Sequence, residues 1–388
     1  MTAAGGPPAE ARVTSPVIVR HAAVSWGLNS HGQLGNGTTD EYGPYGGVSG
    51  LDSDVVQVAA GFSHGLAVIS DGTVRAWGDN TFGQLGDGTQ TERSTPVQVM
   101  GLTGVIQVAA GAGFSLALRS DGTVWAWGAN DAGQLGNGGT SAHQLTPVKV
   151  KRLTRVAQIA AGGYFSFDSL GFSLALRSDG TVWAWGYNHD GQLGTGTTAN
   201  SSLPVQVPGL SHVTGISAGG DFCLATRTSS ISPITSVWAW GGNRRGQLGD
   251  GTLASHLTPG QVTGISAPFI ASIAAGSSYA LVLGTDGRIW AWGDNASGQH
   301  GTAPSSSPVT RPVSTTGSGS GITQLAAGAD HVLALKSDGT VLASGGNSWA
   351  QLGDGNALPI TGRVQVTALA SVTQVAAGWD FSLAVHAE

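Results

Sequence analysis

A unit of about 50 residues, repeated seven times, constrains this chain more than any other feature of its sequence. The first anchor of the unit is Gly-Gln-Leu-Gly, which begins at Gly32, Gly83, Gly133, Gly191 and Gly246, with variants that begin at Gly298 and Ala350. The second anchor is Ala-Gly before an apolar run, with its glycine at Gly61, Gly111, Gly162, Gly219, Gly276, Gly328 and Gly378. A length of 388 residues alone would suggest two or three domains, whereas a sevenfold repeat predicts one closed architecture.

The pattern within each unit is that of short β-strands. Apolar runs such as "VIQVAAG" and "FSLALRS" lead through "SDG" into "TVWAWG", and Asp-Gly supplies the positive backbone angles of a tight hairpin. A polar glycine-rich loop follows, and "TPVQV" has a proline that suits an edge strand. Four strands per unit predict an all-β fold, a seven-bladed β-propeller of four-stranded blades.

The two ends of the sequence indicate how the ring closes. The last residues, "VTQVAAGWDFSLAVHAE", contain only the first two strands of a unit, and "HAAVSWGLNSHGQLG" near the start contains the third strand with its loop. We therefore expect the last blade to combine strands from both ends, which removes an open sheet edge. The expected organisation is a flexible tail over residues 1–15 and a single propeller over residues 16–388.

Composition narrows the classes of function. The net charge is −6, and no run of Lys or Arg is present to follow a phosphate backbone, so we expect no nucleic-acid partner. The single cysteine, Cys223, excludes an internal disulfide framework. No signal peptide and no apolar run of about 18 residues is present, so we expect a cytoplasmic monomer without a membrane, cofactor or metal. Three lysines against fourteen arginines are typical of a high-GC bacterial genome.

Several conspicuous residues are interpreted as scaffold. Tryptophans two positions apart, such as Trp125 and Trp127, point to one face of a strand and would fill the space between blades. The Gly-Gln-Leu-Gly loops lack the signatures of a phosphate or calcium loop. Cys223 replaces the serine of "FSLA" and is expected to be a buried thiol.

Departures from the repeat cluster in the loop after each Ala-Gly anchor. The position that opens the second strand holds His64, Phe114, Phe172, Phe222, Tyr279, His331 and Phe381. The preceding position holds Asp221, Asp330 and Asp380 in three repeats, and one position earlier Phe62 and Trp379 are bulky. If the Ala-Gly strand is innermost, these loops surround the mouth of the central channel. His64 and His331 would alternatively bond a neighbouring blade.

The three aspartates would then face one another, which raises carboxyl pKa values and favours a cation or a proton-transfer role. Candidate catalytic residues are Asp221, Asp330, Asp380, His64 and His331. The candidate binding residues are Phe62, Phe114, Tyr164, Phe165, Phe167, Asp168, Leu170, Phe172, Phe222, Tyr279, Trp379 and Phe381.

An insertion, "YFSFDSL" from Tyr164 to Leu170, lengthens this loop in the third unit. Seven extended residues can cross a channel mouth, and their aromatic side chains would be exposed unless they cover something. The insertion is therefore either a structural plug, a lid over a pocket, or an anchor for a partner. A second extension, between Thr228 and Ser236, is expected on the opposite face as a surface loop.

The repeat "VAAGxxHSLAL-SDGTVWAWG-N-xGQLGDGT" resembles that of the RCC1 (regulator of chromosome condensation) family, from about Val17 to Ala387. The resemblance implies a propeller and leaves the activity open, because family members include a guanine-nucleotide exchange factor and a plant light receptor. The "GWRHT" motif of that receptor is missing. Three functions remain: a propeller that binds a protein partner at the channel mouth, an enzyme or small-molecule binder with acid–base chemistry there, and nucleotide exchange by resemblance alone.

Overall fold

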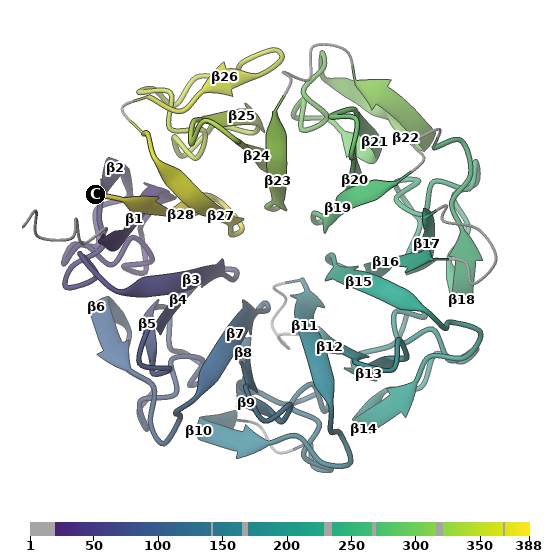
Figure 1. The fold of residues 1–388 in the computed structure, drawn as a ribbon, viewed down its shortest axis with the longest axis horizontal. Helices are drawn as coiled ribbons and strands as arrows, with labels where there is room; N and C mark the ends of the chain where they lie inside the picture. The colour runs from purple at the N-terminus through teal and green to yellow at the C-terminus, as the bar shows by residue number, and fades with distance from the viewer. Residues whose placement is uncertain are drawn as a thin grey trace, which may run out of the picture.

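The computed structural model describes residues 20–140, 143–164, 170–228, 235–265, 269–315, 321–367 and 369–388. These residues form seven antiparallel sheets of four strands, arranged as blades around a central axis (Figure 1). The seven-bladed β-propeller expected from the repeat is thereby confirmed. No helix in these ranges is long and apolar enough to cross a membrane.

Each blade runs from a strand at the channel to a strand at the rim. The first, innermost strands are β3 (Val55–Ala60), β7 (Val105–Ala110), β11 (Val156–Gly163), β15 (Val213–Ala218), β19 (Ile270–Ala275), β23 (Ile322–Ala327) and β27 (Val372–Ala377). The second strands are β4 (His64–Ile69), β8 (Phe114–Arg119), β12 (Gly171–Arg177), β16 (Phe222–Thr228), β20 (Tyr279–Gly284), β24 (His331–Lys336) and β28 (Phe381–Ala387).

The outer half of each blade completes the sheet. The third strands are β5 (Val74–Gly78), β9 (Val124–Ala129), β13 (Val182–Gly186), β17 (Thr235–Gly241), β21 (Ile289–Asn295), β25 (Val341–Gly345) and β1 (His21–Leu28). The outermost strands are β6 (Arg93–Gln98), β10 (His143–Lys149), β14 (Ser201–Gln206), β18 (His256–Gln261), β22 (Ser305–Thr315), β26 (Val364–Gln365) and β2 (Tyr42–Gly47). Blades 1 to 6 begin at β3, β7, β11, β15, β19 and β23, and blade 7 is β27, β28, β1 and β2.

Blade 7 joins the two ends of the chain. β1 pairs antiparallel with β28, in a register that runs from His21 opposite Ala387 to Gly27 opposite Phe381. The ends of the sequence predicted this closure correctly. It removes the open edge that an incomplete seventh sheet would present.

Tryptophans of the third strands connect neighbouring blades, as the sequence indicated. Trp127 is fully buried, and its Nε1 donates a hydrogen bond to the backbone oxygen of Gln84 in the preceding blade, at 2.8 Å. The same bond recurs from Trp26, Trp77, Trp185, Trp240 and Trp292. The third-strand tryptophan and the Gly-Gln-Leu-Gly loop therefore recur together because one binds the other across six of the seven seams.

Glutamines of the inner strands form a second kind of hydrogen bond between neighbouring blades, which was not expected from the sequence. We call the tryptophan bond and this glutamine pair the two fasteners of a seam, the boundary between two blades. Gln57 donates from Nε2 to the oxygen of Val108 in the next blade at 3.3 Å, and its Oε1 accepts from the Val108 amide at 2.8 Å. Equivalent paired bonds are made by Gln107, Gln158, Gln324 and Gln374. A glutamine in an otherwise apolar strand was the available signal.

The seam between blades 5 and 6 lacks both fasteners. Ser344 replaces the third-strand tryptophan of blade 6, and Ser272 stands where five of the other six inner strands have glutamine. His300 replaces the leucine of the Gly-Gln-Leu-Gly loop there and is buried, which lowers its pKa to about 4. Polar contacts do cross this seam: Tyr279 bonds the oxygen of His331 at 2.7 Å, Arg363 bonds Thr315 at 3.0 Å, and Ser297 bonds Asp330 at 3.0 Å.

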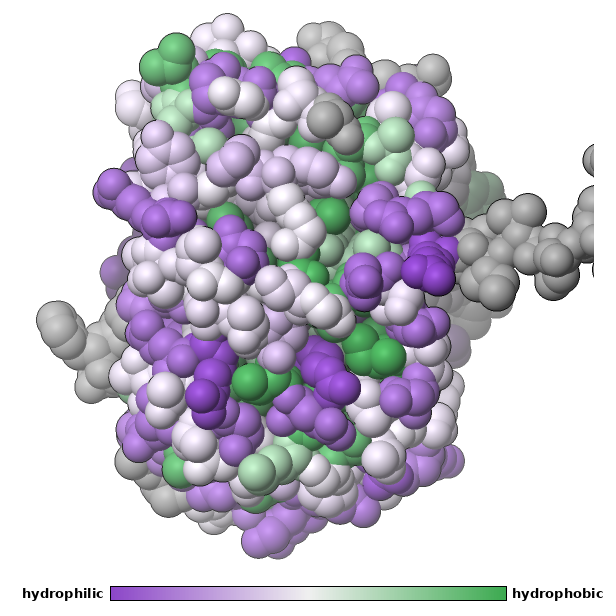
Figure 2. All heavy atoms as spheres, turned by 90° about the vertical axis from the view of Figure 1, so that its left-hand side faces the viewer, coloured by the Kyte–Doolittle hydropathy of each residue, from purple (hydrophilic) through white to green (hydrophobic). Residues whose placement is uncertain are grey.

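The outer wall carries no broad apolar area on the side shown in Figure 2, where hydrophobic residues are scattered among polar ones. Single exposed apolar side chains are usual on a soluble surface. On this side, the described residues form no apolar patch that would indicate a binding surface.

Candidate functional site at the channel mouth

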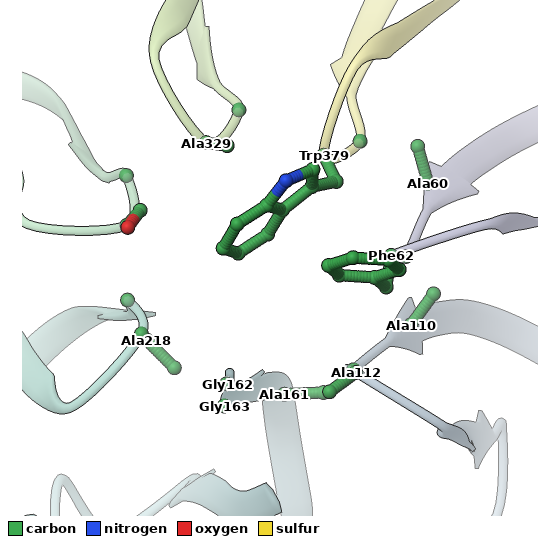
Figure 3. Close-up of a pocket in the computed structure, with 18 of the residues that line it drawn as sticks. Ala60, Phe62, Ala110, Ala112, Ala161, Gly162, Gly163, Ala218, Ala329 and Trp379 are labelled. Atoms are coloured by element: carbon green, nitrogen blue, oxygen red, sulfur yellow. The ribbon is translucent and has the colours of Figure 1, made fainter. Parts of the chain in front are cut away.

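The turns after the inner strands surround one opening of the channel, the mouth, and form what we call the mouth face together with the loops between third and fourth strands. Figure 3 shows the mouth, a hollow of about 90 Å³ whose lining is mostly alanine and glycine. Glycine is needed where neighbouring turns touch: a Cβ on Gly61 would lie 2.7 Å from the backbone oxygen of Gly111.

The seven residues that open the second strands do not line the mouth, which corrects the expectation from the sequence. Their side chains are fully enclosed between blades: His64, Phe114, Phe172, Phe222, Tyr279, His331 and Phe381 each have an exposed fraction of 0%. The residue after the turn points sideways into the core instead of toward the axis. These seven residues are therefore packing residues, and the five aromatic ones offer no surface to a ligand.

The two histidines instead bond the next blade, the structural alternative that the sequence left open. Ser115 uses its hydroxyl hydrogen to bond the oxygen of Gln84 at 2.8 Å, so His64 must donate from Nε2 to Ser115 Oγ, 3.0 Å away. His331 and Ser382 repeat the arrangement at 3.0 Å. Burial lowers the pKa of His64 to about 4 and that of His331 to about 3. Both are neutral buried donors, unsuited to catalysis at the mouth.

Three aromatic residues form a cap over the mouth: Phe62, Tyr164 and Trp379. The rings of Phe62 and Trp379 have centroids 4.6 Å apart, and both point into the opening in Figure 3. The Tyr164 ring meets Trp379 edge-on at 6.4 Å. All three are half-buried, so they cover the channel and still present part of their surface to solvent.

Tyr164 begins the insertion and spans three blades. It leaves blade 3, packs on Gly220 of blade 4, and contacts blade 5, where its hydroxyl lies 3.0 Å from the oxygen of Ser277 and 2.8 Å from Ser278 Oγ. Burial raises the pKa of Tyr164 well above its usual value. The other predicted insertion residues, Phe165, Phe167 and Asp168, lie outside the described residues, and Leu170 is half-buried where the chain enters β12.

The three predicted aspartates separate into two places. Asp221 has an exposed fraction of 7%, accepts a hydrogen bond from Gln247 Nε2 at 3.0 Å, and has its pKa raised to about 6 by burial. Asp330 and Asp380 lie together further round the mouth. Burial raises both of their pKa values; that of Asp380 reaches about 7, because the charge of Asp330 adds to the effect of burial.

Asp330 and Asp380 line a hollow of about 430 Å³ over blades 4 to 7, which we call the acidic hollow. Its ionisable and aromatic lining consists of Asp294, Asp330, Asp380, Arg245, Trp349 and Trp379. Ser297 donates to Asp330 Oδ2 at 3.0 Å and Gln351 to Asp380 Oδ1 at 3.1 Å. Asp330 Oδ1 is buried and has no hydrogen-bond partner among the described residues.

Sequence reasoning missed Asp294 and Trp349, which lie in loops that were interpreted as turns only. For Trp349 the available signal was a bulky indole at a position whose residue differs from blade to blade. Asp294 follows Trp-Gly as Asp79 does in blade 1, so its position in the repeat gave no signal. Carboxylates beside indole faces are suited to holding a cation, since both attract positive charge.

A family model for the regulator of chromosome condensation (RCC1) repeat matches residues 24–68, 71–118, 121–167, 179–226, 236–283, 286–335 and 338–385. The ultraviolet-B receptor UVR8 of Arabidopsis thaliana is 33% identical over 339 residues, 85% of this chain and 74% of the receptor. The E3 ubiquitin-protein ligase HERC2 of Homo sapiens is 31% identical over 328 residues, which are 82% of this chain but 7% of the ligase.

Two solved structures share the fold. Human WBSCR16 superposes with a TM-score of 0.82 at 23% identity, covering 94% of this chain and 98% of that one. Prp20p of Saccharomyces cerevisiae, described with its binding properties to Gsp1p and histones, superposes with a TM-score of 0.78 at 24% identity, covering 94% and 91%. At this identity the likeness establishes the architecture alone.

Proposed function

Because the chain belongs to the regulator of chromosome condensation (RCC1) repeat family, whose propeller fold supports different activities, we propose a function from its own mouth face. The protein is a binding module whose acidic hollow accepts a lysine or arginine side chain of a protein partner. The observation that carries the proposal is the convergence of Asp294, Asp330 and Asp380 beside Trp349 and Trp379 in one hollow.

Charge in the hollow is unbalanced. Three carboxylates line it, and Arg245 is its one basic lining residue among those described. Burial raises the pKa of Asp330 and, with the added charge of Asp330, that of Asp380. Both raised pKa values mean that nearby positive charges and hydrogen-bond donors do not fully offset the cost of ionising these two buried carboxyl groups. A bound ammonium or guanidinium would supply it, and its binding would release protons near neutral pH.

The cap extends this site toward the axis. Trp379 lines the acidic hollow and also contacts Phe62 and Tyr164. A partner whose basic side chain entered the hollow would therefore rest its neighbouring apolar residues on the cap. Partly exposed aromatic residues beside a charged pocket are typical of the residues that dominate binding energy.

The test uses nonapeptides that are uncharged except for a central arginine or lysine, with citrulline as the neutral analogue of arginine. Binding is followed by the change in intrinsic tryptophan fluorescence, to which Trp349 and Trp379 in the hollow contribute. We expect the charged peptides to bind and the citrulline peptide to bind at least tenfold more weakly. Asp380→Asn should weaken binding of the charged peptides by roughly 10-fold or more, the usual cost of losing a charged hydrogen bond.

Asp40→Asn provides the control, because Asp40 is exposed and does not line the acidic hollow. Equal affinities of the arginine and citrulline peptides would contradict the proposal. So would an Asp380→Asn protein that binds the arginine peptide as well as the wild type does.

A second candidate function, acid–base chemistry on a small molecule, rests on Asp380 alone. Its pKa of about 7 allows it to hold or release a proton at neutral pH, and the hollow of about 430 Å³ admits a small ligand. A thermal-shift screen of uncharged and cationic metabolites distinguishes the two: uncharged ligands that stabilise the wild type but not Asp380→Asn would favour this alternative.

A further inference from the structure

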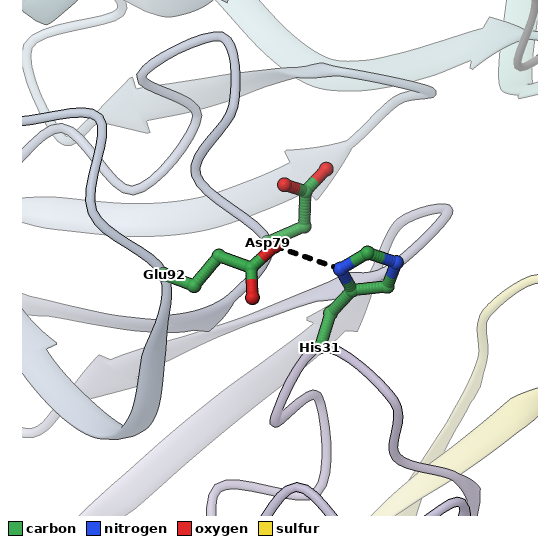
Figure 4. A group of neighbouring side chains, drawn as sticks. All are labelled: His31, Asp79 and Glu92. Carbon is green, nitrogen blue, oxygen red and sulfur yellow. Dashed lines mark hydrogen bonds and ion pairs between the residues drawn. The ribbon is translucent and has the colours of Figure 1, made fainter.

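Three potential metal ligands converge at the seam between blades 7 and 1, outside the acidic hollow. His31, Asp79 and Glu92 each offer a ligand atom within 4.8 Å of the other two (Figure 4). His31 lies in the loop between β1 and β2, Asp79 directly follows β5, and Glu92 precedes β6. The His31 Nδ1 and Glu92 Oε1 atoms are 2.8 Å apart.

The buried member of this trio is held in place. Asp79 has an exposed fraction of 4%; its Oδ2 accepts a bond from Gln84 Nε2 at 2.7 Å, and its Oδ1 accepts from the amide of Thr81 at 2.9 Å. His31 and Glu92 are about half exposed, with side-chain fractions of 43% and 45%. The Asp79 carboxylate is held in place by its hydrogen bonds, whereas His31 and Glu92 are partly exposed and can move. This combination suits a metal ion that enters the site from solvent.

The other six seams provide an internal comparison, because each repeats the same two backbone positions. The pairs equivalent to His31 and Asp79 are Phe82 with Ala129, Ala132 with Tyr187, Asp190 with Gly242, Arg245 with Asp294, Ser297 with Gly346, and Trp349 with Leu28. None of these pairs combines a histidine with a carboxylate. The fold therefore does not require a histidine or an aspartate at these two positions. The placement of His31 and Asp79 beside Glu92 needs an explanation other than the stability of the blades.

We propose that His31, Asp79 and Glu92 bind a divalent transition metal, with Zn²⁺ as the representative ion. Zn²⁺ is bound by histidine nitrogen and by aspartate or glutamate oxygen, and a site with three protein ligands leaves the fourth tetrahedral position to water. Imidazole favours Zn²⁺ over Mg²⁺ and Ca²⁺, which prefer oxygen ligands alone. Because the ligand atoms lie up to 4.8 Å apart, metal binding would require His31 and Glu92, the two partly exposed members, to rotate toward Asp79.

The proposed metal would fasten the loop between β1 and β2 to blade 1. Blade 7 is the blade built from both ends of the chain, and Asp79 and Glu92 belong to blade 1. A metal that bridges them restrains the closing blade against its neighbour, so its binding should raise thermal stability progressively, with the logarithm of its concentration, once that concentration exceeds the Kd.

The experiment titrates tag-free protein with ZnCl₂, MgCl₂ and CaCl₂ by calorimetry and records the melting temperature at each metal concentration. We expect one Zn²⁺ per chain, a rise in melting temperature with Zn²⁺, and no comparable binding of the other two ions. His31→Gln and Glu92→Gln should each lower Zn²⁺ affinity by at least about tenfold and abolish the rise in melting temperature.

The matched control is His256→Gln. His256 forms a partly exposed pair with Asp250 at 3.0 Å, without belonging to a group of three ligands among the described residues, so its loss should leave Zn²⁺ binding unchanged. Wild-type protein that takes up no Zn²⁺ would overturn the proposal. Undiminished binding by both His31→Gln and Glu92→Gln, or equally tight binding of Ca²⁺, would do the same.

Discussion

Asp380→Asn should stabilise the protein, and more at pH 8 than at pH 5. The pKa of Asp380 is raised in the folded protein from 3.8 to about 7 by burial and by the charge of Asp330. A raised carboxyl pKa stabilises the fold at low pH, and this contribution is lost as the pH rises from the unfolded value through the folded one. Asparagine does not titrate, so the variant escapes the loss.

The size of the effect follows from the pKa. Each unit is worth about 1.4 kcal/mol, so the interval from pH 5 to the folded pKa of about 7 amounts to roughly 3 kcal/mol. Asp380 keeps some contact with solvent, which leaves an expected difference of about 1–3 kcal/mol between the two pH values.

Urea unfolding midpoints at pH 5 and pH 8 measure this difference, with Asp40→Asn as the control for a general change in net charge. The same variant should lose affinity for the arginine peptide, since the group that destabilises the fold is the one that holds the ligand. A variant whose gain in stability is the same at both pH values would refute the reasoning, because it would show that Asp380 does not titrate between them.

Three further predictions concern the scaffold. Trp127→Ala should lower the free energy of unfolding by about 3–5 kcal/mol in chemical denaturation, as for other buried aromatic residues, while Gln84 keeps its bond from Ser115. Tyr164→Phe should cost about 1 kcal/mol by removing the contacts with Ser277 and Ser278, and a change of melting temperature measures it. Amide hydrogen exchange should be faster in β23 than in β7, because the seam before β23 lacks both fasteners; equal protection would show that the fasteners do not limit opening.

The repeat made the architecture predictable because one of its anchors, the Gly-Gln-Leu-Gly loop, is bound to the third-strand tryptophan of the next blade. In six blades the third-strand tryptophan donates to the loop of the preceding blade, as Trp127 does to Gln84. Where Ser344 replaces the tryptophan, the loop of the preceding blade also departs, with His300 in place of leucine. Cys223 also behaves as its position in the repeat predicted. It is fully buried, and its Sγ lies 3.2 Å from the oxygen of Gln192, the contact that serine makes elsewhere.

Side-chain direction was the part that the sequence did not determine. Both Trp379 and Phe381 follow the same Ala-Gly anchor, yet Trp379 lies over the mouth and Phe381 is enclosed between blades. The backbone path of the short turn decides which side chain faces the mouth and which faces the core. The sequence does not reveal that path, because both positions hold an aromatic residue. Phenylalanine or tyrosine at the enclosed position in five of seven repeats was a sign of core packing that the sequence analysis interpreted as a binding rim.

The acidic hollow lies beside the seam that the scaffold holds least firmly. Asp294 comes from blade 5 and Asp330 from blade 6, and between these blades Ser344 and Ser272 replace the two residue types that fasten most other seams. Carboxylates that are costly to ionise would weaken any seam further. A bound cation would offset that cost on both sides at once, because it contacts carboxylates of adjacent blades. Partner binding at the hollow should therefore be coupled to the stability of this seam, whereas a ligand on the opposite face should not be.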